Sequence, residues 1–494
     1  MRPEFYQNKW EGLRQSPTTQ DLKPLARQIA LSFLDYYFYN DKYEGEYIRL
    51  LCEMATAFED EDLNLIGSAA LFGIVIEGLC DDFEELQAET YNRVMCQVVS
   101  YCRRMPAGRW LNRRLKDFGI DSYDTMFNRI EKIRSTSDQC RKDIRGPRKI
   151  LVLSRVTIGA DVAITSVMIQ RLAHTFPEAE ILVIGGSKLL QIFGGNPRIK
   201  IDVFDYSRRG GLFERFTAWD AVLETVSREV TFDIAQDVIL VDPDSRLSQL
   251  GVLPVIGDEN HLFFNSRGKD SYPKKMSISE LTNHWLDMVF GESRFCYPMV
   301  WLQKKDLDRA ALFTDGLRAA GCNRIIVINF GVGGNSRKRL GEDFERLLIS
   351  KLLEEPNTVI ILDKGFGEEE LKRTARLMGS FDSYQRMDTS FDGETAGLFA
   401  GGIISIECDM GEIAALISNS DEFIGYDSAC QHIAAAVGVP AYTIFAGSNN
   451  TRFVRRWQAC GPAKSEIIHV DTLTHPPMFD YEDIVARIID ARRG

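Results

Sequence analysis

The chain has 494 residues, of which 45% are hydrophobic and 26% are charged, which is ordinary for a soluble globular protein of about two to four domains. This composition excludes a disordered chain, a collagen-like chain and a disulfide-dense miniprotein. The formal net charge of -12 argues against a broad basic surface, so we expect no nucleic-acid partner.

No targeting or membrane segment is expected. The first residues are polar and lack the apolar core of a signal peptide. The longest apolar stretch, Leu63–Cys80, contains Asn64 and Glu77, which predicts a buried helix and no transmembrane segment. The cysteines form no CxxC pair and the histidines do not cluster with them, so we expect reduced thiols and no metal ligands. The predicted location is cytoplasmic, at most peripheral to the inner membrane.

Residues 1–145 are predicted to form an all-α domain. Apolar residues recur three and four apart along these segments, which places them on one face of a helix. The clearest helical patterns are Leu22–Phe38, Glu46–Phe58 and Glu85–Met105. A polar stretch with a Gly-Pro break, Asp138–Arg148, reads as the linker that ends this domain.

Residues 148–310 alternate between short apolar runs and amphipathic helices, which predicts βαβ units on a parallel sheet. The expected strands are Lys149–Leu153, Glu180–Gly186, Ile199–Phe204 and Val238–Val241, with helices at Ala160–Thr175 and Leu212–Glu229. The last part of this half, about Ser266–Asp315, is predicted to include a hinge.

The same alternation restarts in residues 320–475, and residues 476–494 contain a closing helix, Tyr481–Arg493. The expected strands are Arg324–Gly331, Thr358–Asp363, Glu422–Asp427 and Pro440–Gly447. The expected helices are Gly341–Glu354, Glu368–Leu377, Asp409–Ser418 and Ala429–Val437. The fold class is therefore α/β: two Rossmann-like domains facing a cleft, with the helical domain in front.

Ligands of open α/β sheets bind where strands end and helices begin, so each strand-to-helix loop is a candidate site. In the first loop, Ser154–Asp161, a glycine precedes Asp161. Two interpretations stand side by side. Asp161 caps the helix and complements its dipole, or it points into the cleft as a general base.

The loop Asn329–Gly341 combines glycines with a basic cluster. Gly333 and Gly334 allow the backbone to approach a ligand, and Arg337 and Lys338 supply cations. This pattern suits a diphosphate, although a solvated basic turn would look the same. It is not a Walker A loop, because the Gly-Lys-Ser/Thr ending is absent.

Two further loops predict donor contacts. Asp427 and Ser428 end a strand, and His432 lies one helical turn after Ser428, on the same helix face. The alternative is that His432 is a packed core histidine. Gly447 and Ser448 follow the next strand and could donate hydrogen bonds to a phosphate or a sugar.

Asp242 and Asp244 indicate a different chemistry. They flank Pro243 at the end of an apolar strand and could hold a divalent metal bound to a nucleotide diphosphate. The competing interpretation is an ordinary turn capped by carboxylates.

Taken together, these loops resemble glycosyltransferase family 9, the bacterial ADP-heptose:lipopolysaccharide heptosyltransferases. The resemblance is carried, in the family's order, by Lys149–Ile181, Asn335–Leu348, Ile417–Gly425 and Tyr426–Asn450, and it covers about residues 148–475. It implies a GT-B fold, with residues 148–310 on the acceptor side and residues 320–475 binding the nucleotide-sugar, and inverting transfer without an essential metal. It also implies that Asp161 is the catalytic aspartate, that Lys338 contacts donor phosphate, and that Asp427, Ser428 and His432 contact the diphosphate.

The sequence departs from the family pattern at four places. Ala160 is inserted before Asp161, Ala429 replaces a glycine, Leu340 replaces a tryptophan, and the Phe-Gly-Pro-Thr ending reads Phe-Ala-Gly-Ser at Phe445–Ser448. The lipopolysaccharide enzymes have no counterpart of the helical domain, whereas a protein-glycosylating relative such as an autotransporter heptosyltransferase carries an additional N-terminal region.

The predicted function is an inverting, metal-independent glycosyltransferase that needs no cofactor beyond its nucleotide-sugar. ADP-heptose is favoured as donor and a UDP-sugar is the second choice. The acceptor is a hydroxyl of a glycan, a lipid-linked glycan such as lipopolysaccharide, or a protein. The helical domain could bind that acceptor or drive homo-oligomerisation. The alternatives are a metal-dependent transferase using Asp242 and Asp244, a non-catalytic nucleotide-binding scaffold, and a nucleotide-sugar epimerase.

Overall fold

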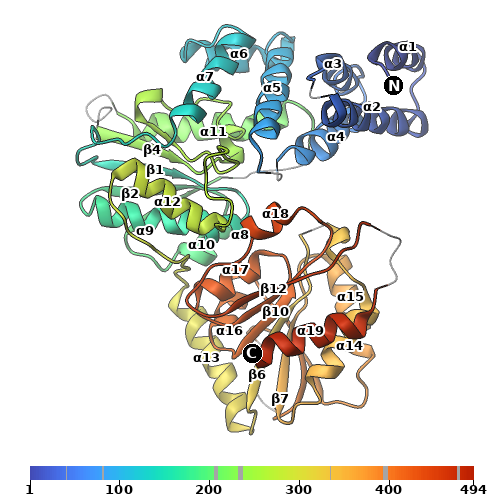
Figure 1. Ribbon diagram of the computed structural model, residues 1–494, viewed down its shortest axis with the longest axis vertical. Coiled ribbons are helices and arrows are strands. Elements are labelled where there is room, and N and C mark those ends of the chain that lie inside the picture. Colours follow the sequence, from blue (N-terminus) through green and yellow to red (C-terminus); the bar gives the residue numbers. More distant parts are fainter. Residues whose placement is uncertain are drawn as a thin grey trace.

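The computed structural model describes residues 1–40, 42–80, 83–204, 210–231, 237–333, 335–392, 399–474 and 479–494. Figure 1 shows helices at the N-terminal end, a first sheet beneath them and a second sheet at the other end of the molecule. The predicted fold class is confirmed: two parallel sheets covered by helices follow an all-α part.

The N-terminal part is helical throughout its described residues. Its elements are α1 (Pro3–Leu13), α2 (Thr19–Asn40), α3 (Gly45–Met54), α4 (Glu61–Ala70), the π-helix η1 (Leu71–Ile76), α5 (Glu85–Cys102), α6 (Arg109–Asp117) and α7 (Tyr123–Thr136). The stretch Leu63–Cys80 is therefore helical over most of its length, as the sequence predicted. Across the described residues, no helix has the length and apolar character that crossing a membrane requires.

The first sheet has the strand order β3-β2-β1-β4-β5. Its strands are β1 (Lys149–Leu153), β2 (Glu180–Gly185), β3 (Ile199–Val203), β4 (Val238–Asp242) and the unpredicted β5 (His261–Phe263). Its helices are α8 (Ile158–Ala160), the π-helix η3 (Asp161–Thr165), α9 (Ser166–Thr175), α10 (Lys188–Phe193), α11 (Glu214–Glu229) and α12 (Ile278–Phe290). All pairs are parallel, and β1 lies between β2 and β4.

The second sheet has the order β12-β11-β10-β6-β7-β9-β8. Its strands are β6 (Arg324–Asn329), β7 (Thr358–Asp363), β8 (Arg386–Ser390), β9 (Gly402–Glu407), β10 (Glu422–Tyr426), β11 (Ala441–Phe445) and β12 (Ser465–His469). Its helices are α13 (Lys304–Ala319), α14 (Glu342–Leu352), α15 (Glu368–Gly379), α16 (Met410–Ser418), α17 (Ala429–Ala436), α18 (Thr451–Arg456) and α19 (Tyr481–Arg493). The strands β8, β9 and β12 were not predicted.

The core explains why β1 is apolar on both faces. Leu151 and Leu153 belong to a cluster that joins one face of the first sheet to the N-terminal helices. Ile150 and Val152 point to the opposite face and belong to a cluster that continues into the second sheet. A third cluster fills the far face of the second sheet beneath α14 and α19. Helices cover both faces of a parallel sheet, so its strands read as continuous apolar runs.

The predicted hinge region crosses from one half to the other. Helix α12 ends at Gly291, which adopts the left-handed conformation with φ of 68°. Residues 292–303 contain no helix or strand. The chain then enters α13, which packs against α16 of the second half, whereas α12 packs against α9 of the first.

Candidate functional site

Asp161 lies at the start of the helical run that follows β1, and its carboxylate is buried. The helix begins at Ile158 with Thr157 as its N-cap, so Asp161 does not cap the helix. Its Oδ1 accepts hydrogen bonds from Arg155 N at 2.7 Å and Thr165 Oγ1 at 2.8 Å, and its Oδ2 accepts one from Ser154 Oγ at 2.7 Å. A carboxylate has about four acceptor positions, which leaves one for a substrate.

Burial shapes the acid-base behaviour of this carboxylate. Only 1% of the Asp161 surface is exposed. The pKa of Asp161 rises from its ordinary value of 3.8 to about 6 because burial disfavours the charged form, and the three hydrogen bonds oppose that rise. Asp161 is therefore ionised at neutral pH and able to accept a proton there, which suits a general base.

Asp242 and Asp244 belong to a buried polar network beside Asp161, at the carboxyl end of β4. Asp242 accepts from Ser245 N and Ser248 Oγ, both at 2.6 Å. Asp244 accepts from Arg267 Nε at 3.0 Å and Nη2 at 3.2 Å, in a buried ion pair. These contacts match the capped-turn interpretation. They do not suit a divalent cation, because a guanidinium of the same charge sign already holds the Asp244 oxygens.

This network is connected to the loop that carries Asp161. Ser245 Oγ donates to Ser154 O at 2.5 Å, and Ser154 Oγ in turn donates to Asp161. The guanidinium of Arg155 donates to Pro243 O at 3.1 Å. The carboxyl ends of β1 and β4 are thereby locked together around the buried carboxylate.

In the second half, the structure brings Lys338 and Asp427 together. Lys338 Nζ lies 2.5 Å from Asp427 Oδ2, and Gln431 Nε2 donates to Asp427 Oδ1 at 2.7 Å. Arg337, the other cation of the predicted pair, is exposed and forms no ion pair within the described part of the chain, whereas the adjacent Arg339 pairs with Glu370.

Helix α17 starts directly after Ser428, its N-cap, and carries His432. Burial lowers the pKa of His432 to about 4, with a smaller contribution from Lys338 in the same direction, so the ring is neutral at pH 7. Its Nδ1 is buried without a hydrogen-bond partner among the described residues. Trp457 lies against the ring, with the two ring centroids 6.0 Å apart. A neutral imidazole beside a helix N-terminus can donate a hydrogen bond to an anionic oxygen.

The glycine loops contribute differently. Gly447 has φ of 79°, and a Cβ there would lie 2.8 Å from Arg337 O, so the absence of a side chain lets the loop after β11 pack on the loop of Lys338. Gly447 N donates to Thr472 Oγ1 at 2.8 Å, and Ser448 Oγ accepts from Asn450 N at 3.2 Å, so both groups are bonded within the protein.

The remaining loop glycines add little that the structure describes. Gly333 has φ of 60°, and a Cβ there would meet open space. Gly334 lies outside the described residues.

The two halves meet at this site. A Cβ on Gly159 would lie 3.2 Å from both Ala429 Cα and His432 Cδ2. Asp161 follows two residues later, so the loop carrying the buried carboxylate contacts the start of α17 directly. Figure 1 shows α8 and α17 at the junction between the two sheets. A second contact joins Gln191 Oε1 to Met410 N at 3.1 Å.

Sequence reasoning missed a buried pair at the same edge of the second sheet. Asn329 ends β6 and its Nδ2 donates to Asp363 Oδ2, at the end of β7, at 2.5 Å. Burial raises the pKa of Asp363 to about 6. The sequence could have indicated this pair, because each of the two polar residues ends a mostly apolar run. Asp363 forms part of no metal-ligand group, since no such group occurs among the described residues.

Part of the sequence matches a known protein family. Residues 403–488 match the model of glycosyltransferase family 9 (heptosyltransferase). The match contains Asp427, Ser428 and His432, and it begins after Asp161 and Lys338. No curated protein matches the sequence.

Several solved structures are similar in outline. The family 9 glycosyltransferase from Veillonella parvula DSM 2008 is 16% identical, with 71% of this chain and 97% of that chain covered and a TM-score of 0.48. The E. coli heptosyltransferase WaaC with ADP is 12% identical, with 69% and 99% covered and a TM-score of 0.45. The E. coli ADP-heptose lps heptosyltransferase II is 11% identical, with 69% and 98% covered and a TM-score of 0.45.

The family match links residues 403–488, the C-terminal part of the second sheet, to the glycosyltransferases. More narrowly, the match confirms, over residues 403–488, the resemblance to family 9, the heptosyltransferases, that the sequence motifs indicated.

Proposed function

We propose that the chain transfers a heptose or hexose from a nucleotide-diphosphate sugar to a hydroxyl acceptor, with inversion at the anomeric carbon and without a catalytic metal. In this proposal Asp161 is the general base. Lys338, Asp427, Ser428 and His432 form the diphosphate site, and Arg337 reaches the donor from the exposed rim.

The contact of Gly159 with Ala429 and His432 carries the proposal. It sets a buried carboxylate, ionised at neutral pH, beside the start of a helix that presents an unpartnered imidazole nitrogen. Such a transfer needs two groups close together: a base for the acceptor hydroxyl and an anion-binding site for the leaving group.

The proposed step balances as follows. The acceptor hydroxyl passes its proton to Asp161 Oδ2, and its oxygen attacks the anomeric carbon from the face opposite the diphosphate. The bond between that carbon and the diphosphate oxygen breaks, and its electron pair leaves on the diphosphate. Lys338 stabilises the growing negative charge, and the neutral His432 donates a hydrogen bond to it.

The Lys338–Asp427 ion pair has a consequence for donor binding. Asp427 Oδ2 lies 2.5 Å from Lys338 Nζ and neutralises its charge. A diphosphate competes with this carboxylate for the ammonium group, so binding shifts Lys338 toward the ligand and leaves Asp427 to Gln431.

Donor and acceptor identity belong to the proposal. ADP-heptose is the favoured donor, with a UDP-sugar second, and the acceptor is a glycan, a lipid-linked glycan or a protein. We also propose the division into residues 1–145, 148–310, 320–475 and 476–494, and a cytoplasmic location, which subcellular fractionation of the native protein tests.

A thermal-shift panel of ADP, UDP, GDP, CMP and their sugars, with and without EDTA, is the first experiment. A ligand present at a hundredfold excess over its Kd stabilises the native state by about 2.7 kcal/mol, which is readily measured. One nucleotide whose shift survives EDTA supports the proposal. A shift that requires a divalent metal favours the Asp242 and Asp244 alternative instead.

Transfer itself is then assayed with the donor so found. NMR of the product gives the anomeric configuration, and inversion is expected. Binding without turnover identifies a non-catalytic scaffold, and conversion of the sugar without acceptor identifies an epimerase.

A further inference from the structure

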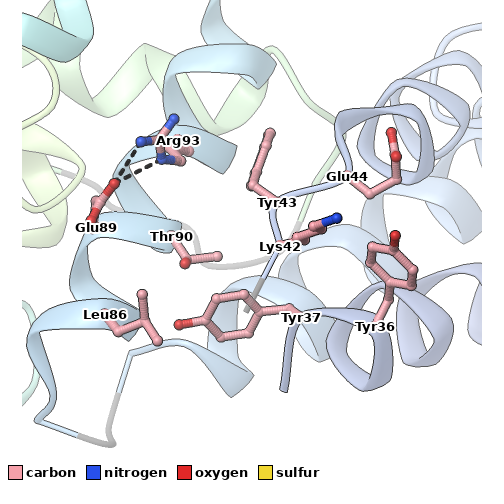
Figure 2. Close-up of a pocket in the computed structure, with 9 residues that line it drawn as sticks. All are labelled: Tyr36, Tyr37, Lys42, Tyr43, Glu44, Leu86, Glu89, Thr90 and Arg93. Carbon is pink, nitrogen blue, oxygen red and sulfur yellow. Dashed lines mark hydrogen bonds and ion pairs between the residues drawn. The ribbon is translucent and has the colours of Figure 1, made fainter. Parts of the chain in front are cut away.

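A cavity in the all-α part lies apart from the transfer site. It has a volume of about 340 Å³ and is walled by the end of α2, the segment before α3, and the first half of α5 (Figure 2). Its lining residues are Tyr36, Tyr37, Lys42, Tyr43, Glu44, Leu86, Glu89, Thr90 and Arg93. Figure 1 shows α2 and α3 at the N-terminal end, away from the junction of α8 and α17. This volume falls at the small end of the range for ligand sites in proteins.

The charges around the cavity cancel. Lys42 and Arg93 supply two positive charges, and Glu44 and Glu89 supply two negative ones. A site for a phosphate or a carboxylate would carry excess positive charge, and a site for a cation the reverse. The walls therefore fit a neutral ligand that can exchange several hydrogen bonds.

Three tyrosines give the cavity an aromatic surface. In Figure 2 the ring of Tyr37 points toward Thr90 and Leu86, while Tyr36 lies at the right of the view and Tyr43 at the top. Aromatic rings with a polar edge suit a ligand that has apolar ring faces and hydroxyl groups around its rim. A sugar ring has both properties, and the carboxylates and guanidinium can bond its hydroxyls.

The walls are held in place before any ligand binds. Glu89 Oε1 accepts from Arg93 Nη2 at 2.6 Å and from Nε at 2.9 Å. The Arg93 guanidinium also stacks over the Phe127 ring at 4.6 Å. Tyr43 donates to Gln97 on α5. A preformed wall avoids part of the ordering cost of binding.

We propose that this cavity binds one neutral saccharide unit, and, resting on the proposed function, that this unit belongs to the acceptor glycan or to the glycosylated product. The acceptor would then be held at two separated points, the cavity and the transfer site. This assigns the all-α part a role in glycan recognition.

The test is saturation-transfer-difference NMR of the full chain with methyl glycosides of mannose, glucose and galactose, each titrated to obtain a Kd. We expect at least one to bind. Tyr36→Ala removes one aromatic ring from the wall of the cavity and should weaken glycoside binding about three- to tenfold. Leu86→Trp, placed at a side chain that is 44% exposed, should fill the entrance and abolish the signal.

Two matched variants control for the substitutions themselves. Tyr39→Ala lies on the same helix as Tyr36, is 85% exposed and does not line the cavity. Leu65→Trp lies on α4 at a side chain that is 37% exposed and also outside the cavity. Both should bind the glycoside as the unsubstituted chain does.

Two results would overturn the inference: no glycoside binding, or equal binding by Leu86→Trp and the unsubstituted chain. The nucleotide thermal-shift panel is run on the same variants and should be unchanged in all of them. Glycoside binding without nucleotide binding would refute the proposed function but leave saccharide binding by the cavity intact. Nucleotide binding without glycoside binding would refute the cavity proposal and leave the proposed function intact.

Discussion

Replacing Asp161 by asparagine should make the protein more stable and nearly inactive. The folded environment raises the pKa of Asp161 from 3.8 to about 6, so at pH 8 the charged carboxylate is penalised in the folded state only. The shift of about two units corresponds to about 3 kcal/mol of destabilisation, because each unit is worth about 1.36 kcal/mol. Asparagine has the same shape and carries no charge.

The hydrogen bonds reduce that gain but do not reverse it. The asparagine oxygen can take the place of Oδ1 and accept from Arg155 N and Thr165 Oγ1. Its NH2 group then faces Ser154 Oγ, a mismatch that costs about 1 kcal/mol. The expected net stabilisation at pH 8 is about 2 kcal/mol.

The pH dependence has a definite sign. A raised carboxyl pKa means that the folded state holds its proton more tightly, so the penalty grows as pH rises from 3.8 to about 6 and is complete above that. At pH 5 the penalty is about half of its value at pH 8, so the advantage of asparagine should be about 1 to 2 kcal/mol smaller there than at pH 8. This difference does not depend on the hydrogen-bond mismatch.

Urea unfolding of the full chain, followed by tryptophan fluorescence at pH 8 and pH 5, measures both numbers. Asp244→Asn is the matched contrast, since it makes the same chemical change but leaves Arg267 as an unpaired buried charge. It should destabilise by about 3 to 5 kcal/mol. In the transfer assay, Asp161→Asn should lower kcat by about 10² to 10⁴-fold, the range for a lost general base. An Asp161→Asn chain that is less stable at pH 8, or that keeps its transfer rate, would refute this reasoning.

Three further outcomes are expected. Gly447→Ala should weaken ADP binding about tenfold, because the added Cβ displaces the loop of Lys338. Gly333→Ala introduces the same left-handed strain in open space and should not weaken binding. Equal effects of the two substitutions in calorimetric titrations would exclude the clash as the cause. Lys338→Met should weaken ADP but not adenosine by about ten- to a hundredfold, and a loss shared by adenosine would contradict a diphosphate contact. Transfer by the unsubstituted chain should fall as pH drops through about 6, where Asp161 takes up its proton, and a rate that stays flat down to pH 5 would argue against that base.

Much of the fold could be predicted from local pattern. The strands β1, β7 and the helix α19 lie where apolar runs and helical periodicity put them, residue for residue. The strands β5 and β8 were missed for different reasons. β5 has three residues, which is too short for a periodic signal, and β8 alternates polar residues at the edge of its sheet.

The residues of the candidate site could be proposed from the sequence, but their contacts could not. Asp161, Lys338 and Asp427 follow the ends of strands and His432 lies in the helix after the last of these, which the order of elements in the sequence indicates. The pairing of Lys338 with Asp427 links positions far apart in the chain, and so does the packing of Gly159 on His432. A pattern of neighbouring residues does not predict contacts between residues that lie this far apart in the chain.

The sequence by itself determined the class of fold and the loops where chemistry could occur, because strand burial, helix periodicity and polar strand ends are properties of neighbouring residues. The tertiary structure decided what those residues do. It shows that Asp161, near the start of its helix, is a buried acceptor of three hydrogen bonds, and that Asp244 forms an ion pair with Arg267. Charge, burial and pKa depend on which atoms lie within a few ångströms, and that is fixed only when distant segments pack together.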